Sequence, residues 1–195
     1  MKALDNLSGY RIKLASASPR RRELLGMLGI DFSVSRGLGI DESYPDDIEA
    51  EDVACYISQK KAEAHRLSMS ADELIITADT VVINNGEVLG KPSDEENAKE
   101  MLRALSGHIH KVVTGVTLVT ASRQVSFSVV TEVEFAELAD EEINEYVELF
   151  HPLDKAGAYG IQEWIGCIGV KGINGSYYNV MGLPLHRLYR ELKRF

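Results

Sequence analysis

Three successive arginines, Arg20, Arg21 and Arg22, stand at the start of a segment with the marks of a helix N-terminus. Ser18 can cap the free backbone amides, and Pro19 suits the first helical position. At about 100° per residue, Arg21 faces the body of the protein, Arg20 lies on its flank and Arg22 points away. A guanidinium facing inward needs an anion. A phosphate fits, because the helix end adds backbone donors, and an internal carboxylate is the alternative.

Asp79 is a carboxylate inside the run Leu74 to Ile83, whose β-branched composition is typical of a strand covered on both faces. An ionised group there is costly unless it is paired or bound to a metal ion. A structural salt bridge, or a place at the sheet edge, is the alternative to catalysis. Glu42 in an acidic loop upstream and Lys91 after a tight turn favour a site for metal and phosphate.

Two pairs of residues leave alternatives open. Lys60 falls inside the apolar stripe of a helix expected over about 50–67, Lys61 falls at its edge, and the spacing does not choose between them. His108 and His110 form an H-x-H pair that could offer two metal ligands on one strand face. Since no third ligand is nearby, packing or hydrogen bonding is the commoner role for such histidines.

Composition limits the class of protein. The 195 residues suit one domain or two small lobes that share a core, and 45% are hydrophobic. The net charge of −9 would repel a polyanion, so stable nucleic-acid binding is not expected. Cys55 and Cys167 belong to no C-x-x-C pair, and both are expected to be reduced core thiols. Without an apolar run of membrane-helix length or a signal peptide, we expect a cytoplasmic protein and no membrane partner.

Several nucleotide and hydrolase motifs are missing. The stretch from Gly86 to Pro92 is one residue short of a Walker loop and lacks its Ser or Thr, and Gly37-Leu38-Gly39 lacks the third glycine of a dinucleotide fingerprint. No G-x-S-x-G nucleophile elbow is found. A metal-activated water therefore fits this sequence better than covalent catalysis.

The alternation of apolar residues predicts an α/β fold with a mixed sheet. Strands are expected over 11–15, 32–35, 73–84, 87–89, 111–121, 124–135, 164–170 and 177–180. Helices are expected over 18–28, 50–67, from a Ser93–Glu96 capping box to 105, from an Asp140 cap to 150, and over 184–195. The runs 111–121 and 124–135 resemble an antiparallel pair, and Asn174-Gly175 is the expected junction of the last two strands.

Four motifs together resemble the Maf family of nucleotide pyrophosphatases: LASASPRR at 14–21, ADTVV at 78–82, GKP at 90–92 and DKAGAYGIQ at 154–162. The resemblance covers nearly the whole chain in order. It implies one Maf-like domain over residues 1–195, elongated and two-lobed, with a central mixed β-sheet flanked by helices, a fold like that of inosine triphosphate pyrophosphatase, and a site in the cleft between the lobes.

The resemblance also implies roles for individual residues. Asp79 matches the proton acceptor and, with Glu42, would hold a divalent cation such as Mg²⁺, Mn²⁺ or Co²⁺, although Asp41 is also acidic. The other positions carried over are the catalytic cations Arg20, Arg21, Lys61 and Lys91, and the substrate-binding residues Ser16, Ser18, Arg20, Thr80 and Gln162.

The segment 154–162 is similar to the branch of the family that acts on dTTP and UTP, so pyrimidine triphosphates, including CTP or modified ones, are the expected substrates. The Gln162 amide offers a donor and an acceptor side by side, which can match the imide edge of uracil or thymine. A branch that prefers methylated GTP and a nucleotide-binding regulator of septum formation are the alternatives. The resemblance makes a homodimer plausible.

Overall fold

The computed structural model describes residues 2–35 and 38–195. Gly37, the first residue of the Gly37-Leu38-Gly39 stretch and of the acidic loop, lies outside the described residues. The chain divides into two compact units. Unit 1 comprises Met1–Asp79, Thr114–Val129 and Gly182–Phe195, and unit 2 comprises Thr80–Val113 and Val130–Met181. The predicted cleft between two lobes stays a prediction.

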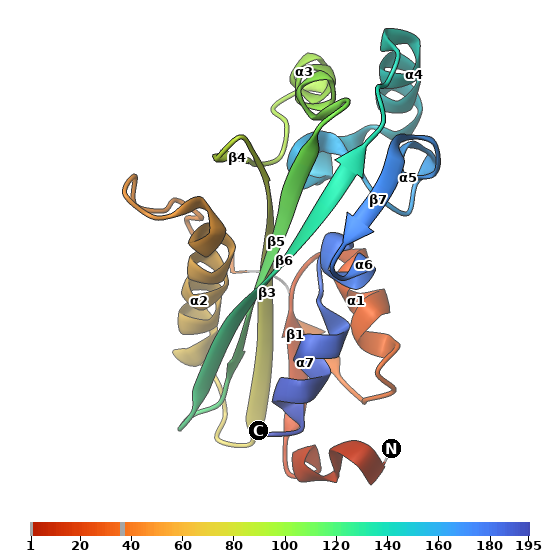
Figure 1. Ribbon diagram of the computed structural model, residues 1–195. Coiled ribbons are helices and arrows are strands. Elements are labelled where there is room, and N and C mark those ends of the chain that lie inside the picture. The colour runs from red at the N-terminus through yellow and green to blue at the C-terminus, as the bar shows by residue number, and fades with distance from the viewer. Residues whose placement is uncertain (1, 36–37) are drawn as a thin grey trace. The chain divides into compact units, whose positions relative to one another are not determined.

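A seven-stranded sheet has the order β2-β1-β3-β5-β6-β7, and β4 pairs with β3 (Figure 1). Strand β1 is parallel to β2 and to β3, whereas β3 with β4 and β6 with β7 are antiparallel. The predicted mixed sheet is therefore confirmed. Its strands are β1 (Arg11–Ala15), β2 (Ser33–Ser35), β3 (Glu73–Asn84), β4 (Glu87–Leu89), β5 (Ile109–Val119), β6 (Gln124–Phe135) and β7 (Val170–Asn174).

Unit 1 carries helices on both faces of its strands (Figure 1). Helix α2 (Val53–Arg66), entered through a short 3₁₀ turn at Ala50–Asp52, covers one face, and α1 (Pro19–Gly26) and α7 (Leu185–Leu192) cover the other. A further 3₁₀ segment, Lys2–Leu7, precedes β1. One core cluster lies between α2 and the strands and joins Ala15, Ala62, Ile75 and Val119. The strand of Asp79 is consequently covered on both sides, as its composition predicts.

Unit 2 has its own core. Helices α3 (Glu95–Leu105) and α4 (Asp140–Phe150) pack on one another, and the short helices α5 (Trp164–Gly169) and α6 (Tyr177–Val180) follow later in the chain. The largest buried side chains of this core are Tyr146 and Phe135, packed with Leu102, Leu105, Val133, Ile143 and Ile165. Two 3₁₀ turns, Pro152–Asp154 and Ala156–Ala158, lie between α4 and α5.

Two predicted strands are wrong. Residues 164–169 form α5, and only the stretch that begins at Val170 pairs with β6 as β7. A side chain at Gly166 would overlap the carbonyl oxygen of Ile161, so glycine lets this helix close on the preceding turn. Residues 177–180 form α6, because the Ser176 side chain accepts a hydrogen bond from the Asn179 amide and caps the helix.

Two predicted helix caps are also wrong by one residue. Asp94, and not Ser93, caps α3, because its carboxylate accepts the Asn97 amide proton at 2.8 Å. Asp140 is the first residue of α4 instead of its cap, and the Glu142 carboxylate accepts from the preceding Ala139 amide at 2.8 Å. The Ser93–Glu96 capping box is absent because Ser93 donates its hydroxyl to Asp94. The remaining predicted elements are present with shifts of a few residues at their ends.

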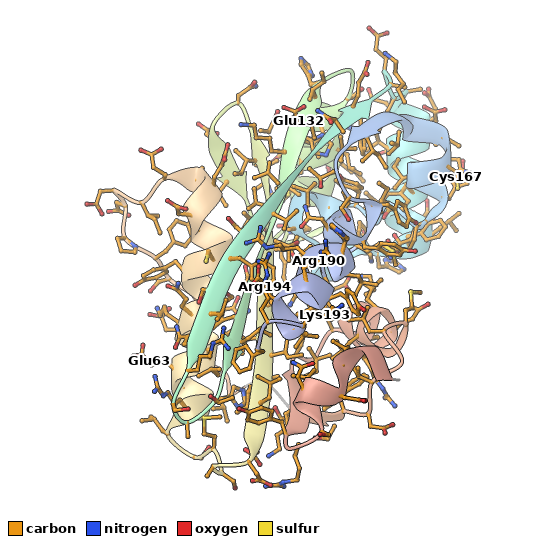
Figure 2. The ribbon with its side chains drawn as sticks, turned by 60° about the horizontal axis from the view of Figure 1, so that its bottom comes forward. Glu63, Glu132, Cys167, Arg190, Lys193 and Arg194 are labelled. Carbon is orange, nitrogen blue, oxygen red and sulfur yellow. The ribbon has the colours of Figure 1, made fainter. Side chains whose placement is uncertain are left out.

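Both cysteines differ from expectation. Both cysteines are free thiols, but Cys167 is exposed on α5 (Figure 2) and Cys55 is half-buried, so neither is a core thiol. Within the described residues, no helix combines the length and apolarity needed to span a membrane. Arg190 of α7, and Lys193 and Arg194, which follow that helix, have exposed basic side chains (Figure 2).

Candidate active site

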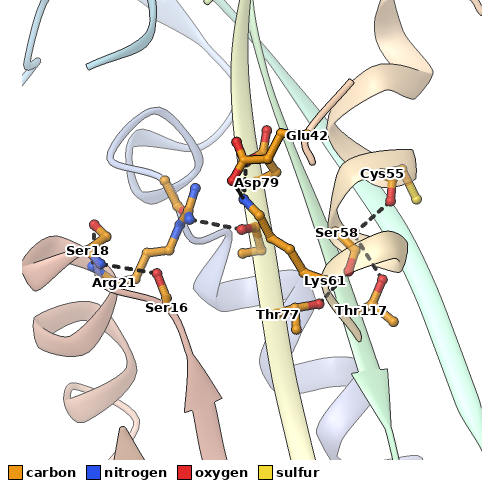
Figure 3. A network of polar contacts seen from close by, with 12 residues as sticks. Ser16, Ser18, Arg21, Glu42, Cys55, Ser58, Lys61, Thr77, Asp79 and Thr117 are labelled. Carbon is orange, nitrogen blue, oxygen red and sulfur yellow. Dashed lines mark hydrogen bonds and ion pairs between the residues drawn. The ribbon is translucent and has the colours of Figure 1, made fainter. Parts of the chain in front are cut away.

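Asp79, Lys61 and Glu42 meet in unit 1 (Figure 3). The Lys61 ammonium donates to Asp79 Oδ1 at 2.6 Å and lies 3.0 Å from Glu42 Oε1. Asp79 is the last residue of unit 1 and is 9% exposed, whereas the Glu42 side chain is half-exposed. Two carboxylates from distant parts of the chain therefore converge on one positive charge.

Arg21 reaches the same strand from the opposite side. Its guanidinium donates from Nη1 to the carbonyl of Ala78 and from Nε to the carbonyl of Gly182, both at 2.9 Å. Burial lowers the pKa of Arg21, and the negative charges of Asp79 and Glu42 act in the opposite direction. The prediction that Arg21 faces inward is confirmed, and its guanidinium lies beside the residue that precedes Asp79.

The start of α1 presents the predicted polar residues. Ser18 caps the helix, its hydroxyl accepting from the Arg21 amide at 3.5 Å, and the Ser16 hydroxyl accepts from the Ser18 amide at 3.2 Å (Figure 3). Arg20 is half-buried, and its charge adds to the lowering of the pKa of Arg21. Arg22 is exposed, as the helical wheel predicts. This turn concentrates positive charge and backbone donors, the combination that binds anions.

The position of Lys61 depends on how α2 is held against the sheet. The Thr77 hydroxyl of β3 donates to the Ser58 carbonyl at 2.7 Å, and the Ser58 hydroxyl lies 2.9 Å from the Thr117 hydroxyl of β5 (Figure 3). Gly115 of β5 lies directly against the α2 backbone, where a Cβ would collide with Ala54. These contacts fix α2 close to β3 and β5, and so they bring Lys61 to Asp79.

The structure distinguishes Lys60 from Lys61 and Asp41 from Glu42, two choices that the sequence left open. The Lys60 ammonium donates to the carbonyl of Ser43 at 2.8 Å, whereas Lys61 contacts both site carboxylates. Asp41 accepts from the amide and hydroxyl of Ser43, and these hydrogen bonds lower its pKa. Glu42 is thus the loop acid that lies beside Lys61.

The other predicted site residues belong to unit 2. Thr80 follows Asp79 in β3, so its side chain points to the opposite face of the strand. Lys91 is exposed between β4 and α3, and Gln162 is exposed between the 3₁₀ turns and α5. The Gly157 amide donates to the Gly90 carbonyl at 3.0 Å, which ties the segment of Lys91 to the segment of Gln162.

His110 has a structural environment. Its Nε2 lies 2.7 Å from the Tyr159 hydroxyl, and its ring packs edge-on against Phe135 and Tyr159. Burial lowers its pKa to about 4, so the ring is neutral at pH 7. His108 is exposed and pairs with the Ser106 carbonyl. The interpretation of this pair as packing and hydrogen-bonding residues is confirmed.

Sequence analysis gave no role to Lys155, a buried lysine within the 154–162 segment that ends at Gln162. Lys155 is 7% exposed, and its ammonium lies 2.8 Å from Asp154 and 3.2 Å from Glu163. Glu163 also accepts a hydrogen bond from the buried Tyr146 hydroxyl. The available signal was Glu163 itself, an acid directly after Gln162 and at the start of an apolar helix.

A family model described as Maf-like protein matches residues 11–195. The chain belongs to the Maf family. Among its relatives, a "dTTP/UTP pyrophosphatase" of Phocaeicola vulgatus is 59% identical over 191 residues, which are 98% of this chain and 99% of that protein. A "dTTP/UTP pyrophosphatase" of Parabacteroides distasonis is 57% identical over 192 residues, 98% of this chain and all (100%) of that one. The Maf resemblance seen in the motifs is confirmed.

Solved structures support the fold of this Maf-family chain. The Staphylococcus aureus Ham1 protein superposes with a TM-score of 0.52 at 17% identity and covers 94% of this chain and 98% of its own. A HAM1 protein from Coxiella burnetii gives a TM-score of 0.52 at 17% identity, with 95% and 100% coverage. The predicted fold class, an α/β fold with a mixed sheet flanked by helices, is confirmed.

The chemistry of the donor set fits a divalent cation at Glu42 and Asp79. Hard cations such as Mg²⁺ prefer carboxylate oxygens, and both carboxylates already meet one cationic group, the Lys61 ammonium. Within residues 2–35 and 38–195, no cluster of three or more His, Cys, Asp and Glu side chains is arranged for a metal ion. A cation held here would consequently take its further ligands from phosphate oxygens and water.

Proposed function

We propose that this chain hydrolyses dTTP and UTP to the nucleoside monophosphate and pyrophosphate. One observation carries the proposal: Lys61 of α2 and Glu42 of the acidic loop form a charged cluster with Asp79 of β3, and the Arg21 guanidinium donates to the carbonyl of Ala78, the residue before Asp79. Positive groups and paired carboxylates at one point suit a triphosphate and a divalent cation. The names of the relatives that match over their full length supply the pyrimidine substrates.

Asp79 is the proton acceptor in the proposed reaction. A water held at its carboxylate attacks the α-phosphorus, its proton passes to Asp79, and a new phosphorus–oxygen bond forms. The bond from the α-phosphorus to the oxygen bridging to the β-phosphate breaks, and pyrophosphate leaves with that oxygen. A nearly buried carboxylate suits this role because few other waters reach it.

The cationic side chains neutralise the phosphates. An ammonium has three N–H donors, and the two carboxylates at Lys61 occupy two of them. Lys61 can therefore keep its protein contacts and also donate to a phosphate oxygen, while the Arg21 guanidinium adds positive charge beside Asp79. Loss of one such preorganised group typically raises the barrier by ~3 kcal/mol. Arg20 and the Ser16 and Ser18 turn add donors at the start of α1.

A divalent cation, Mg²⁺, Mn²⁺ or Co²⁺, would be held by Glu42 and Asp79, and when bound it supplies Lewis-acid polarisation of the phosphate and of the attacking water. The roles of Lys91 in phosphate binding and of Thr80 and Gln162 in base selection follow from the family resemblance. We also propose that residues 1–195 act as one Maf-like domain in the cytoplasm, and that neither a membrane nor a nucleic acid is a stable partner. A homodimer is the proposed assembly.

The test of the reaction is pyrophosphate release from dTTP and UTP with Mg²⁺ or Mn²⁺. Asp79→Asn should fold normally and lose roughly 10³-fold in turnover, because the amide cannot accept the proton. Asp41→Asn is the matched control, since the Asp41 carboxylate accepts from Ser43 of its own loop, whereas Glu42 is the loop acid that meets Lys61, and it should keep wild-type turnover. Wild-type turnover by Asp79→Asn would contradict the assignment.

A second pair of variants tests the cation. Lys61→Met should lose roughly 100-fold in turnover, because its ammonium meets the site carboxylates. Lys60→Met removes a lysine of the same helix that contacts the Ser43 carbonyl instead, and it should retain most of the activity. Equal losses in the two variants would show that the two lysines act only through the stability of α2.

The base preference is tested separately with Gln162→Ala. If the Gln162 amide reads the imide edge, the variant should lower the ratio of kcat/KM for UTP to that for GTP by roughly tenfold, because one paired donor and acceptor are lost. An unchanged ratio removes this contact and leaves the pyrophosphatase reaction intact.

A further inference from the structure

Gln162 lies in a tight turn of unit 2 that is closed by a backbone hydrogen bond between its first and last residues. The Glu163 amide donates to the Gly160 carbonyl at 2.9 Å, so Ile161 and Gln162 are the two central residues of the turn. Ile161 is 6% exposed and packs in the core of unit 2, whereas the Gln162 side chain is exposed. The turn thus anchors one side chain in the core and presents the next to solvent.

A single phenol joins the two ends of this turn. The Tyr146 hydroxyl donates to Glu163 Oε2 and accepts the Gly160 amide proton at 3.0 Å. Tyr146 comes from α4, is fully buried and stacks on Phe150 with ring centroids 5.1 Å apart. Burial and the Glu163 carboxylate raise the pKa of Tyr146, so the hydroxyl keeps its proton and remains the donor. The turn is consequently held by a rigid ring of a neighbouring helix.

Lys155 completes the arrangement from the segment that leads into the turn. Its buried ammonium lies 3.2 Å from Glu163 Oε1 and 2.8 Å from Asp154 Oδ1. Gly160 leaves the room that the Glu163 carboxylate needs, because a Cβ there would lie 2.7 Å from Glu163 Cδ. A buried charge pair requires good geometry to offset its desolvation, and this geometry fixes the side chain that follows Gln162.

We propose that Tyr146, Lys155 and Glu163 are positioning residues that set the orientation of Gln162 and thereby the preference of the enzyme for uracil and thymine bases. The proposal rests on the proposed function, since it requires that Gln162 contacts the base. None of the three needs to touch the nucleotide. Their effect is to reduce the conformational freedom of the turn before the substrate binds, so that less entropy is lost when the amide pairs with the base.

Tyr146→Phe is the principal variant, because it keeps the buried ring and deletes the hydroxyl that joins Gly160 to Glu163. The expected result is a fall of roughly tenfold in the ratio of kcat/KM for UTP to that for GTP, with GTP turnover little changed. Tyr159→Phe is the matched control. It also deletes a buried hydroxyl of unit 2, but one that pairs with His110 instead of with the turn, and it should keep the wild-type ratio.

The double variant Tyr146→Phe/Gln162→Ala decides whether Tyr146 acts through Gln162. We expect it to discriminate no worse than Gln162→Ala alone, since the hydroxyl has then nothing left to position. A further loss in the double variant, an unchanged ratio in Tyr146→Phe, or equal losses in Tyr146→Phe and Tyr159→Phe would each overturn the proposal. Should Tyr146→Phe fail to fold, Glu163→Gln, which keeps an acceptor for the phenol and removes the charge paired with Lys155, takes its place with the same expectations.

Binding distinguishes failure of this proposal from failure of the proposed reaction. Dissociation constants of non-hydrolysable UTP and GTP analogues, measured by calorimetry on the same variants, report base preference without turnover. If the wild-type chain binds the UTP analogue more tightly but releases no pyrophosphate, the reaction is refuted and the ratio of dissociation constants still tests the positioning residues. If Gln162→Ala binds both analogues as the wild type does, the positioning role is refuted and the reaction stands.

Discussion

The close approach of α2 to β5 at Gly115 makes a strong prediction for Gly115→Ala. A Cβ at this position would collide with backbone atoms of Ala54 and Cys55, which cannot rotate away as a flexible side chain could. To reach a normal carbon separation of about 3.5 Å, the helix must recede from the strand by roughly 1 Å. Overpacking of this kind costs roughly 1–3 kcal/mol, which in a chain of this size lowers the melting temperature by roughly 3–10 °C.

The same displacement should reach the active site. Lys61 lies two helical turns after Ala54 on the same face of α2, so a rigid shift moves its ammonium away from Asp79, which it now meets at 2.6 Å. A misplacement of about 1 Å in a catalytic group can cost roughly 100-fold in rate. We therefore expect Gly115→Ala to lose about two orders of magnitude in pyrophosphate release at a temperature where it is still folded.

The assay combines thermal unfolding followed by circular dichroism with pyrophosphate release from UTP. Gly26→Ala, in the last turn of α1, is the control, because a Cβ there meets nothing within 4 Å. It should leave turnover unchanged and raise stability by about 0.5 kcal/mol, as alanine is favoured over glycine in a helix. A Gly115→Ala protein with wild-type melting temperature and turnover would refute the reasoning that α2 packs against β5 as closely as the glycine at position 115 allows.

Three further predictions concern single interactions. In a double-mutant cycle of Lys61→Met and Asp79→Asn, the two changes should couple by about 1–3 kcal/mol in unfolding free energy, because Lys61→Met leaves the nearly buried Asp79 carboxylate without this ammonium and Asp79→Asn leaves Lys61 paired with the half-exposed Glu42 instead. Additivity of the two changes would mean that solvent screens the pair. Because burial depresses the folded-state pKa of His110 to about 4, its contribution to the free energy of unfolding is complete above pH 6.5 and is lost as the pH falls towards that pKa. Between pH 7 and 4.5 the wild type should therefore lose about 2 kcal/mol more stability than His110→Gln; His65, whose pKa burial also lowers, is present in both proteins and cancels. Parallel plots of unfolding free energy against pH for the two proteins would contradict this. Ser176→Ala removes the cap of α6 and should lower the free energy of unfolding in urea by about 1 kcal/mol. A loss of less than ~0.3 kcal/mol would show that the cap contributes little.

The long elements of the fold are predictable because a consistent pattern of apolar or β-branched residues extends over many positions. The run from Leu74 to Ile83 has only apolar and β-branched residues around Asp79, and it is a strand covered on both faces. The segments 164–169 and 177–180 are too short for a period to emerge, and they were predicted as strands. Their helices depend on Gly166 closing on Ile161 and on Ser176 capping the next turn, contacts that become evident only in three dimensions.

The site divides in a similar way. The inward direction of Arg21 follows from helix geometry alone, and the structure places it as predicted. The choice of Lys61 over Lys60 does not follow from the helical wheel, because it depends on which strand residue faces the helix edge. Lys155 was missed because a lysine among small residues carries no periodic signal, and only the fold shows that it is buried.

The boundary between the two units falls inside β3, between Asp79 and Thr80. One peptide bond therefore joins the carboxylate proposed to accept a proton to the residue that the family associates with substrate choice, and their Cα atoms are fixed about 3.8 Å apart. Because neighbours in a strand project to opposite faces, the side chain at position 80 and the Asp79 carboxylate are aimed in different directions. In the proposed assignment of roles, a single replacement at position 80 would therefore change base selection and leave the acid of the hydrolytic step in place.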